Sequence, residues 1–277
     1  MSRQAPAVGA AVVAVAAQIV YPLVDGNARD TVTVVVVLAL TVAAVAHAWA
    51  TRGGRWTAIM LAVTAGLGLF SEIVGTATGF PFGCYAYADG RLGPELAGVP
   101  LLVPLAWTAG SYPVWIAVTH VADRSRPVVR VALATVGIVG WDLYLDPQMV
   151  ADGQWVWCSP HPSPPGLEPI PWTNYLGWLL IAGAIAVTLA WLDRSRPTST
   201  RREDVVPLSL FLWTWLGSAL AHAAFLPELG WSAVYGLVGM GIVGVPLVTR
   251  SRRAGTISEC SPTPCPVFDD RAPEWPR

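Results

Sequence analysis

Eight apolar runs, each close to 20 residues long, are the feature that most limits how this chain can fold. About 20 mostly apolar residues are needed for a helix to cross the hydrocarbon core of a bilayer. In that core every backbone polar group must be paired within the protein, which favours helices. The sequence therefore predicts an all-α, polytopic integral membrane bundle of about eight transmembrane helices. The predicted spans are Ala5–Val24, Thr31–Ala50, Trp56–Thr78, Val99–Ala122, Val128–Leu145, Asn174–Leu192, Val205–Leu226 and Trp231–Thr249.

The distribution of arginine sets the orientation of these spans. All 17 basic residues are arginine, and with the N-terminus inside only Arg29 and Arg91 fall in outer segments. Cytoplasmic loops of membrane proteins carry an excess of Lys and Arg. We therefore expect both termini to be cytoplasmic, in a multi-pass protein of the cell membrane. The predicted domains are a single transmembrane domain over residues 1–253 and a disordered cytoplasmic tail over residues 254–277.

Composition and motifs exclude several classes of function. The charged fraction is 13% and the net charge is −1, so nothing suggests nucleic-acid binding. No P-loop or dinucleotide fingerprint follows a strand pattern. No histidine-rich or aspartate-rich metal motif is present either. We therefore expect neither a metal nor another cofactor.

Acidic residues inside the apolar runs are the strongest functional signal. A charged side chain in a span costs at least about 2.5–3.5 kcal/mol on insertion scales and therefore requires a reason. Glu72 is the only acid in the third run, and Asp142 and Asp146 are spaced i, i+4, which places them on one helical face. Asn174 and His222 are predicted to lie at the same depth in the membrane as these acids, near its outer surface. Structural alternatives remain open for each: interhelical hydrogen bonding, interfacial solvation or packing.

Two long outer segments, residues 79–98 and 146–173, are rich in Gly, Pro and aromatic residues. Long loops in a compact protein are often functional or disordered, and the aromatic residues favour ordered, membrane-facing loops. Cys84 and Cys158 fall one in each segment, so a disulfide between them is one option and two free thiols the other.

This inventory favours acid chemistry. A carboxyl group that is desolvated and lies near other carboxyl groups can stay protonated at neutral pH. It can then give its proton to an electron-rich double bond. Aromatic faces can stabilise the resulting carbocation by cation–π attraction.

Four motifs between Trp56 and Trp191 resemble those of the CruF-type carotenoid biosynthesis proteins. They are Glu72-x-x-Gly-x-x-Thr-Gly-x-Pro-Phe82-Gly-x-Tyr85-x-Tyr87, then Gly98-Val-Pro-Leu with Pro104-x-x-Trp107, then Trp141-Asp142-x-x-x-Asp146-Pro-x-Met-Val with Gly153-x-Trp-x-Trp157, and finally Pro171-x-x-Asn174-x-x-Gly-Trp178. Known members of this family are integral-membrane carotenoid hydratases, which add water across the terminal double bond of an acyclic carotenoid end group to give a tertiary alcohol.

The resemblance implies a cofactor-independent hydro-lyase whose partners are a polyene substrate, water, the lipid bilayer and other carotenoid biosynthesis enzymes. Glu72 and Asp142 are the expected acid/base pair, and Asp146 and Asn174 are expected to place the water. The expected substrate-binding residues are Phe82, Tyr85, Trp107, Trp141, Trp178 and His222.

Three rival functions remain at this point. A membrane carotenoid cyclase shares the protonation step but traps the cation with an internal double bond. A transporter would use the same acids as a proton relay. A non-catalytic pigment-binding protein would need no acid at all.

Overall fold

The computed structural model describes residues 3–194 and 199–259. Within these residues eight α-helices are joined by short turns and two longer outer segments, and four very short strands lie in those segments. The helices are α1 (Ala5–Val20), α2 (Gly26–Arg52), α3 (Gly54–Thr78), α4 (Leu102–Val121), α5 (Pro127–Ala151), α6 (Trp172–Asp193), α7 (Val205–Ala224) and α8 (Gly230–Glu259). The strands are β1 (Tyr85–Tyr87), β2 (Glu95–Leu96), β3 (Val99–Pro100) and β4 (Trp155–Trp157), and two 3-10 turns are η1 (Tyr21–Leu23) and η2 (Pro227–Leu229).

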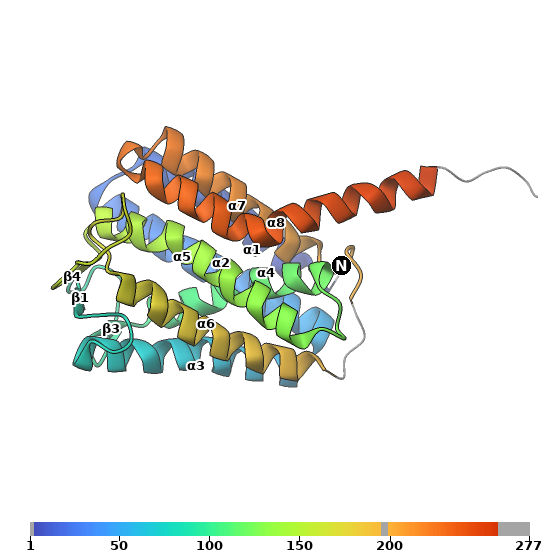
Figure 1. The fold of residues 1–277 in the computed structure, drawn as a ribbon, viewed down its shortest axis with the longest axis horizontal. Helices are drawn as coiled ribbons and strands as arrows, with labels where there is room; N and C mark the ends of the chain where they lie inside the picture. The colour runs from blue at the N-terminus through green and yellow to red at the C-terminus, as the bar shows by residue number, and fades with distance from the viewer. Residues whose placement is uncertain (1–2, 195–198, 260–277) are drawn as a thin grey trace, which may run out of the picture.

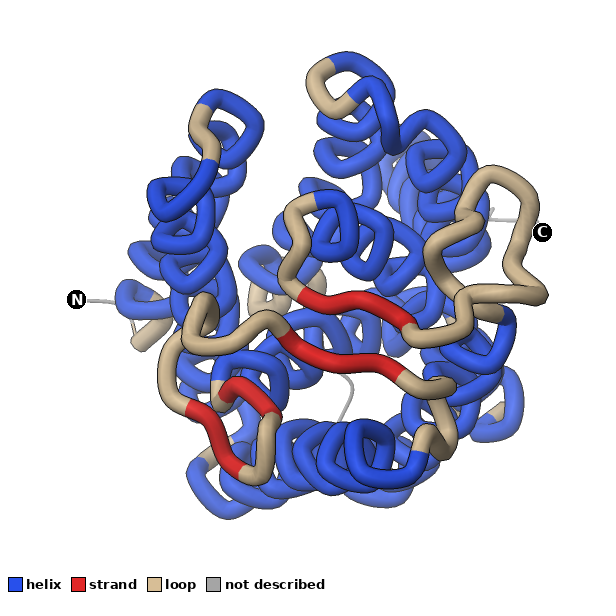
Figure 2. The backbone as a smooth tube through the Cα atoms, turned by 90° about the vertical axis from the view of Figure 1, so that its left-hand side faces the viewer, coloured by secondary structure: helices blue, strands red, loops and turns tan. Residues whose placement is uncertain are grey.

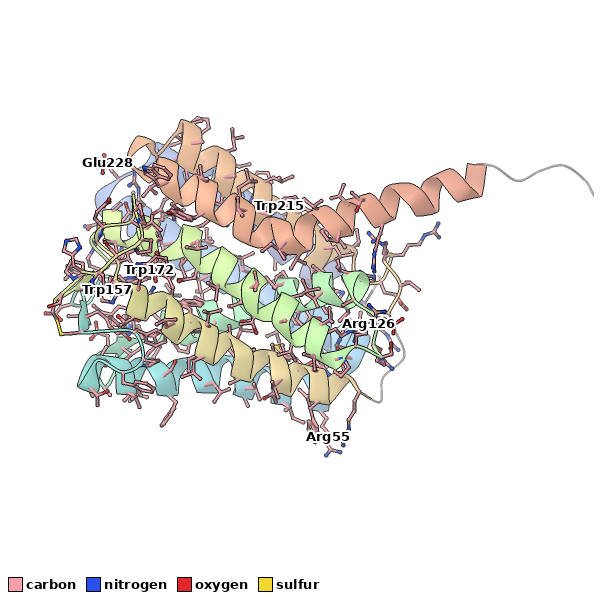
Figure 3. All side chains as sticks on the ribbon, viewed as in Figure 1. Arg55, Arg126, Trp157, Trp172, Trp215 and Glu228 are labelled. Carbon is pink, nitrogen blue, oxygen red and sulfur yellow. A yellow bond between two sulfur atoms is a disulfide. The ribbon has the colours of Figure 1, made fainter. Side chains whose placement is uncertain are left out.

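The helices run side by side, with the strands gathered at one end of the bundle and the N-terminus at the other (Figure 1). α8 also ends on the side of the N-terminus. Arg55 and Arg126 lie at this same end, whereas Trp157, Trp172 and Glu228 lie at the strand-bearing end (Figure 3). We call the arginine-rich end the inner end and the strand-bearing end the outer end. The tail expected after Arg253 begins inside α8, and residues 260–277 lie outside the described residues.

Seven of the eight helices are long and apolar enough to cross a membrane, which makes the chain a multi-pass membrane protein. The one not in this set is α4, which packs against α2, α3, α5, α6, α7 and α8. Because α4 is enclosed by other helices, its surface need not be apolar throughout. Its buried Thr108, Ser111 and Tyr112 face protein instead of lipid. The predicted all-α membrane bundle is confirmed.

Close packing of α5 and α8 depends on glycine. A Cβ placed on Gly140 would lie 2.5 Å from the backbone nitrogen of Met240, and one on Gly239 would lie 2.8 Å from the Cα of Gly140. Such backbone contact is how membrane helices pack tightly when lipid offers no hydrophobic driving force between them. It fixes the position of α5, which carries Asp142 and Asp146.

A buried ionic network ties the inner ends of five helices together. Arg52 of α2 lies 4.0 Å from Asp193 of α6 and 3.6 Å from Asp204, which directly precedes α7. The indole N–H groups of Trp56 and Trp115, from α3 and α4, donate to Asp193 at 3.0 and 2.8 Å. Burial raises the pKa of Asp204, but a hydrogen bond from His120, a second from Ser199 and the charge of Arg52 outweigh it and hold that pKa below its usual range.

Each of the two arginines on the outer side is paired with an aspartate. Arg29 donates to Asp152 at 2.6 Å, and Arg91 donates to both carboxylate oxygens of Asp30, at 3.0 and 2.7 Å. Each outer arginine thus has an aspartate that balances its positive charge, although arginine is otherwise confined to the inner segments.

Removal of the central cation should destabilise the inner network. In Arg52→Met, Asp193 and Asp204 lose their buried partner, and breaking a buried ion pair on one side costs about 3–5 kcal/mol. We expect a clear drop in the thermal unfolding midpoint of the detergent-solubilised protein. Arg55→Met, the same change at an exposed neighbour, is the control and should leave the midpoint nearly unchanged. Equal midpoints for the two variants would contradict this account of the network.

Candidate active site

Glu72 occupies a closed pocket of hydrogen-bond donors near the outer end of α3. Its side chain is 5% exposed. Tyr85 donates a short hydrogen bond to Oε2, Tyr87 donates to the same oxygen at 2.7 Å, and the indole of Trp107 donates to Oε1 at 3.2 Å. Three donors to one carboxyl group are the arrangement that stabilises its ionised form.

The two tyrosines reach Glu72 because β1 is held in place from outside. β1 pairs antiparallel with β4, with Tyr85 opposite Trp157 and Tyr87 opposite Trp155. A disulfide joins Cys84 to Cys158 at the edge of this pair, so the bridge that the sequence left open is present. Residues two apart in a strand point to one face, and both phenols therefore point down onto α3.

Both phenols remain proton donors. Burial, followed by the charge of Glu72 and its hydrogen bond, raises the pKa of Tyr85. Burial and the charge of Glu72 likewise raise the pKa of Tyr87 well above its ordinary value. Each tyrosine therefore stays protonated over the physiological range and keeps donating to Glu72.

Asp142 and Asp146 form a second buried acidic group on α5. The amide of Asn174 bridges them: it donates a short hydrogen bond to Asp146 and lies 3.5 Å from Asp142 Oδ2. Oδ1 of Asp142 is buried and has no hydrogen-bond partner among the described residues. The i, i+4 spacing thus does place both carboxyl groups on one face, where they share one neutral partner.

A cavity connects the two acidic groups. Its lining includes Glu72 from α3, Asp146 from α5 and Asn174 from α6, but not Asp142, whose Oδ2 lies 3.5 Å from the Asn174 amide nitrogen. It also includes Phe82, Tyr85, Trp107, Trp141 and Trp178, five of the six residues expected to bind substrate.

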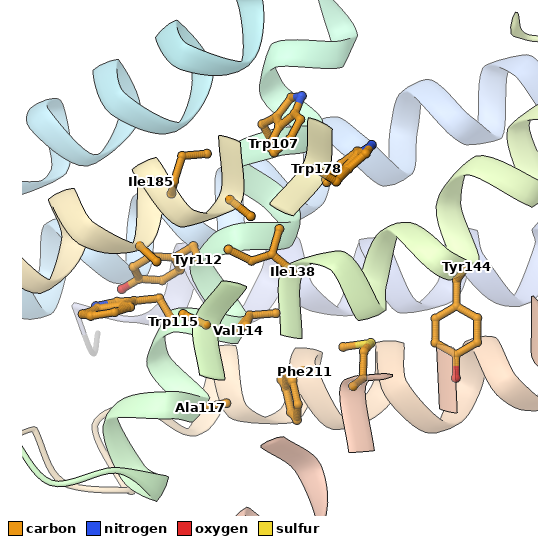
Figure 4. Packing of buried hydrophobic residues seen from close by; sticks show 14 of the residues in the cluster. Trp107, Tyr112, Val114, Trp115, Ala117, Ile138, Tyr144, Trp178, Ile185 and Phe211 are labelled. Carbon is orange, nitrogen blue, oxygen red and sulfur yellow. The ribbon is translucent and has the colours of Figure 1, made fainter. Parts of the chain in front are cut away.

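Three indoles form an aromatic wall in this cavity. Trp107 and Trp178 are stacked, with ring centroids 3.9 Å apart, and lie side by side in the core (Figure 4). Trp141 meets Trp178 edge-on at 5.8 Å. Such faces attract cations when water is excluded.

His222 is not among the residues that line this cavity. Its ring nitrogens contact Ser232 Oγ at 2.9 Å and Gln148 Oε1 at 3.0 Å, and Gln148 does line the cavity. His222 thus supports the cavity wall from behind. Tyr87 and Gln148 were not among the site residues predicted from sequence. The spacing Tyr85-x-Tyr87 could have revealed the first, whereas nothing local marks the second.

Comparisons with known proteins identify the family of this chain. The carotenoid biosynthesis protein family matches residues 32–243. The chain belongs to this family. It is also 34% identical, over 175 residues, to the bisanhydrobacterioruberin hydratase of Haloarcula japonica. That alignment covers 60% of this chain and 56% of the relative's length. No solved structure matches the chain. The family resemblance found in the motifs is confirmed, and it gives the chain a role in carotenoid biosynthesis.

The position of Trp107 depends on Gly68, one turn before Glu72. A Cβ at Gly68 would lie 2.6 Å from the indole Cδ1 of Trp107. Gly68→Ala should therefore push Trp107 away from Glu72 and destabilise the protein by about 1–3 kcal/mol, as overpacking does. The thermal midpoint and the tryptophan fluorescence spectrum would report both effects.

Gly66→Ala is the matched control, because a Cβ there meets nothing within 4 Å. Alanine is the better helix former by about 1 kcal/mol, so this variant should be at least as stable as the wild type. A Gly68→Ala protein that behaves like Gly66→Ala would show that Trp107 is not held by this contact.

Proposed function

We propose that this protein is a carotenoid hydratase, which adds water to the terminal C=C of an acyclic carotenoid end group and gives a tertiary alcohol. One observation carries the proposal. Among the described residues, the buried acids Asp30, Asp193 and Asp204 each have an arginine partner. Glu72, Asp142 and Asp146 are equally buried but have no cation within salt-bridge distance among the described residues. Glu72 and Asp146 line a cavity rich in aromatic residues, and Asp142 is linked to Asp146 through Asn174.

Buried carboxyl groups without a cation are costly if ionised. Glu72 has three donors and can carry a negative charge. Asp142 and Asp146 share the Asn174 amide as a common donor, so we infer that this pair retains a proton. Of the two, Asp146 reaches the cavity. We therefore assign the proton-donor role to Asp146, with Asp142 as its proton-sharing partner. From sequence, Glu72 and Asp142 were the expected acid/base pair, with no decision on which is the acid, and Asp146 was expected to place water.

In the proposed reaction Asp146 gives its proton to the less substituted carbon of the terminal double bond. The tertiary cation that forms lies against the indoles of Trp107 and Trp178. A water molecule forms the new C–O bond, and its surplus proton passes to Glu72. Water in the same cavity returns that proton from Glu72 to the aspartate pair. The balance is alkene plus water to alcohol, with no oxidant or reductant required.

The name of the Haloarcula japonica relative supports this reaction class. Cyclisation is the alternative, because it begins with the same protonation. The polar lining favours water capture: Asp146, Asn174 and Glu72 surround the reacting end with groups that bind water, whereas a cyclase needs an apolar surface around its cation.

Loss of either acid group should abolish hydration. In a host that accumulates acyclic carotenoids, the wild type should raise the carotenoid mass by one water per modified end. Glu72→Gln and Asp146→Asn should each lower this conversion by about 10²–10⁴-fold, the usual contribution of a general acid or base. Asp142→Asn should be impaired as well, since Asp146 would lose its proton-sharing partner.

Glu228→Gln and Asp89→Asn make the same chemical changes at exposed positions and should convert like the wild type. Membrane levels of every variant are measured in parallel. An unchanged mass with a new ring would establish cyclisation instead. Full conversion by both Glu72→Gln and Asp146→Asn would refute the mechanism.

A further inference from the structure

The cavity that contains the acids continues well beyond them. From Glu72 and Asp146 it passes between α2 and α5 and reaches the far side of the bundle. There it is lined by Gln18, Tyr21 and Pro22 from α1 and η1, and by Trp213, Gly217 and Ala221 from α7. α1 and α7 are far apart in sequence, so this end of the cavity is created only by their placement in the fold.

α1 and α7 are joined at their inner halves. Ala7 and Ala14 of α1 belong to one buried cluster with Val206 and Leu210 of α7. The side chain of Gln4 also donates to the backbone oxygen of Glu203 at 2.8 Å. The inner halves are therefore sealed by packing and by a hydrogen bond.

The outer halves of the same helices are separated. Seen from the outer end, the α1–α2 hairpin stands apart from the α7–α8 hairpin (Figure 2). The hydrogen bond from Trp213 Nε1 to Gln18 Oε1, 2.9 Å long, spans this separation. Between this hydrogen bond and the outer end of α7, the helix lines the cavity with Gly217 and Ala221, and these small residues leave the cavity open.

This opening faces lipid. Ile19 of α1 and Leu216 and Leu220 of α7 flank it and are 53%, 51% and 61% exposed. In a membrane-spanning bundle such apolar, outward-facing side chains contact hydrocarbon. A molecule dissolved in the bilayer can therefore approach the opening without crossing water.

The size of the cavity indicates what occupies the opening. Its space, about 160 Å³, is below the roughly 300–1,000 Å³ typical of pockets that enclose a small molecule. It suits the end of a polyene, but not a chain about as long as the bilayer is thick. The rest of such a chain must leave the bundle, and the separation of α1 and α7 is an exit that leads directly into hydrocarbon.

We propose that the outer halves of α1 and α7 form a lateral portal, bridged by Gln18 and Trp213, which admits a long polyene from the bilayer and holds its middle part during reaction. This inference rests on the proposed function for the identity of the ligand. The portal itself is defined by the cavity and the two helices.

The test narrows the portal and measures uptake of a long polyene. Gly217→Trp and Ala221→Trp place a large ring in the opening. A Cβ at Gly217 would lie 3.4 Å from Trp213, an ordinary contact, so the backbone there accommodates a β-carbon without a shift. The controls are Val234→Trp and Val238→Trp, at exposed apolar positions of α8 that do not line the cavity.

Two quantities are measured on purified protein in nanodiscs: the long acyclic carotenoid bound per protein, by absorbance, and the hydration of a short alkene with the same isoprenoid end group. The portal variants should bind the long polyene at least about tenfold more weakly than the controls, which corresponds to about 1.4 kcal/mol. The ratio of long-chain to short-chain turnover should fall by a similar factor.

Wild-type uptake of the long polyene in both portal variants would overturn the proposal. Equal loss of long and short substrates would do so as well, because it would show damage to the site instead of a blocked entrance. If the wild type binds the polyene but hydrates neither substrate, the hydratase proposal fails while the uptake comparison still decides the portal.

Discussion

A carboxyl group that is buried in a membrane protein without a cation must be given hydrogen-bond donors, and Glu72 receives three. They come from Tyr85, Tyr87 and Trp107, which lie 13, 15 and 35 residues further along the chain. To bring them together, the chain needs the β1–β4 pair, the Cys84–Cys158 bridge and the close contact of α3 with α4. Much of the outer end of the bundle can thus be understood as support for one side chain.

The two ends of the bundle treat buried acids in opposite ways. At the inner end Arg52 lies beside Asp193 and Asp204, and histidine and tryptophan donors complete their pairing. That network pairs its buried acids with a cation and is structural. At the outer end Asp142 and Asp146 share one neutral amide, and an oxygen of Asp142 lacks a partner. A group that must gain and lose a proton cannot be held by a permanent cation, and this difference separates the acids that we propose to react from the structural ones.

The sequence predicted the parts of this fold that depend on local pattern. Apolar runs of about 20 residues located the helices, and the arginine distribution placed Glu72, Asp142 and Asn174 at one level. The i, i+4 rule placed Asp142 and Asp146 on one face. What it missed depends on contacts between distant segments. β1 and β4 are only three residues long and are separated by the whole of α4 and α5, so no periodicity reveals their pairing. His222 was expected to bind substrate because it lies at the same membrane depth as the acids. Its ring nitrogens instead contact Ser232 and Gln148, and these contacts set the direction of its side chain.

The choice between water and an internal double bond as the trap for a carbocation depends on what surrounds the cation. An indole wall stabilises the cation in either case, so Trp107 and Trp178 do not discriminate. The polar groups do. Asn174, Asp146 and Gln148 all line the cavity, and in the proposed reaction the substrate end would lie beside Asp146. Polar groups in this position would bind water beside the cation, and bound water would capture it before a chain held extended toward α1 and α7 could fold back to form a ring. The extended path of the cavity and its polar end therefore favour the same outcome, addition of water to one end of a long polyene.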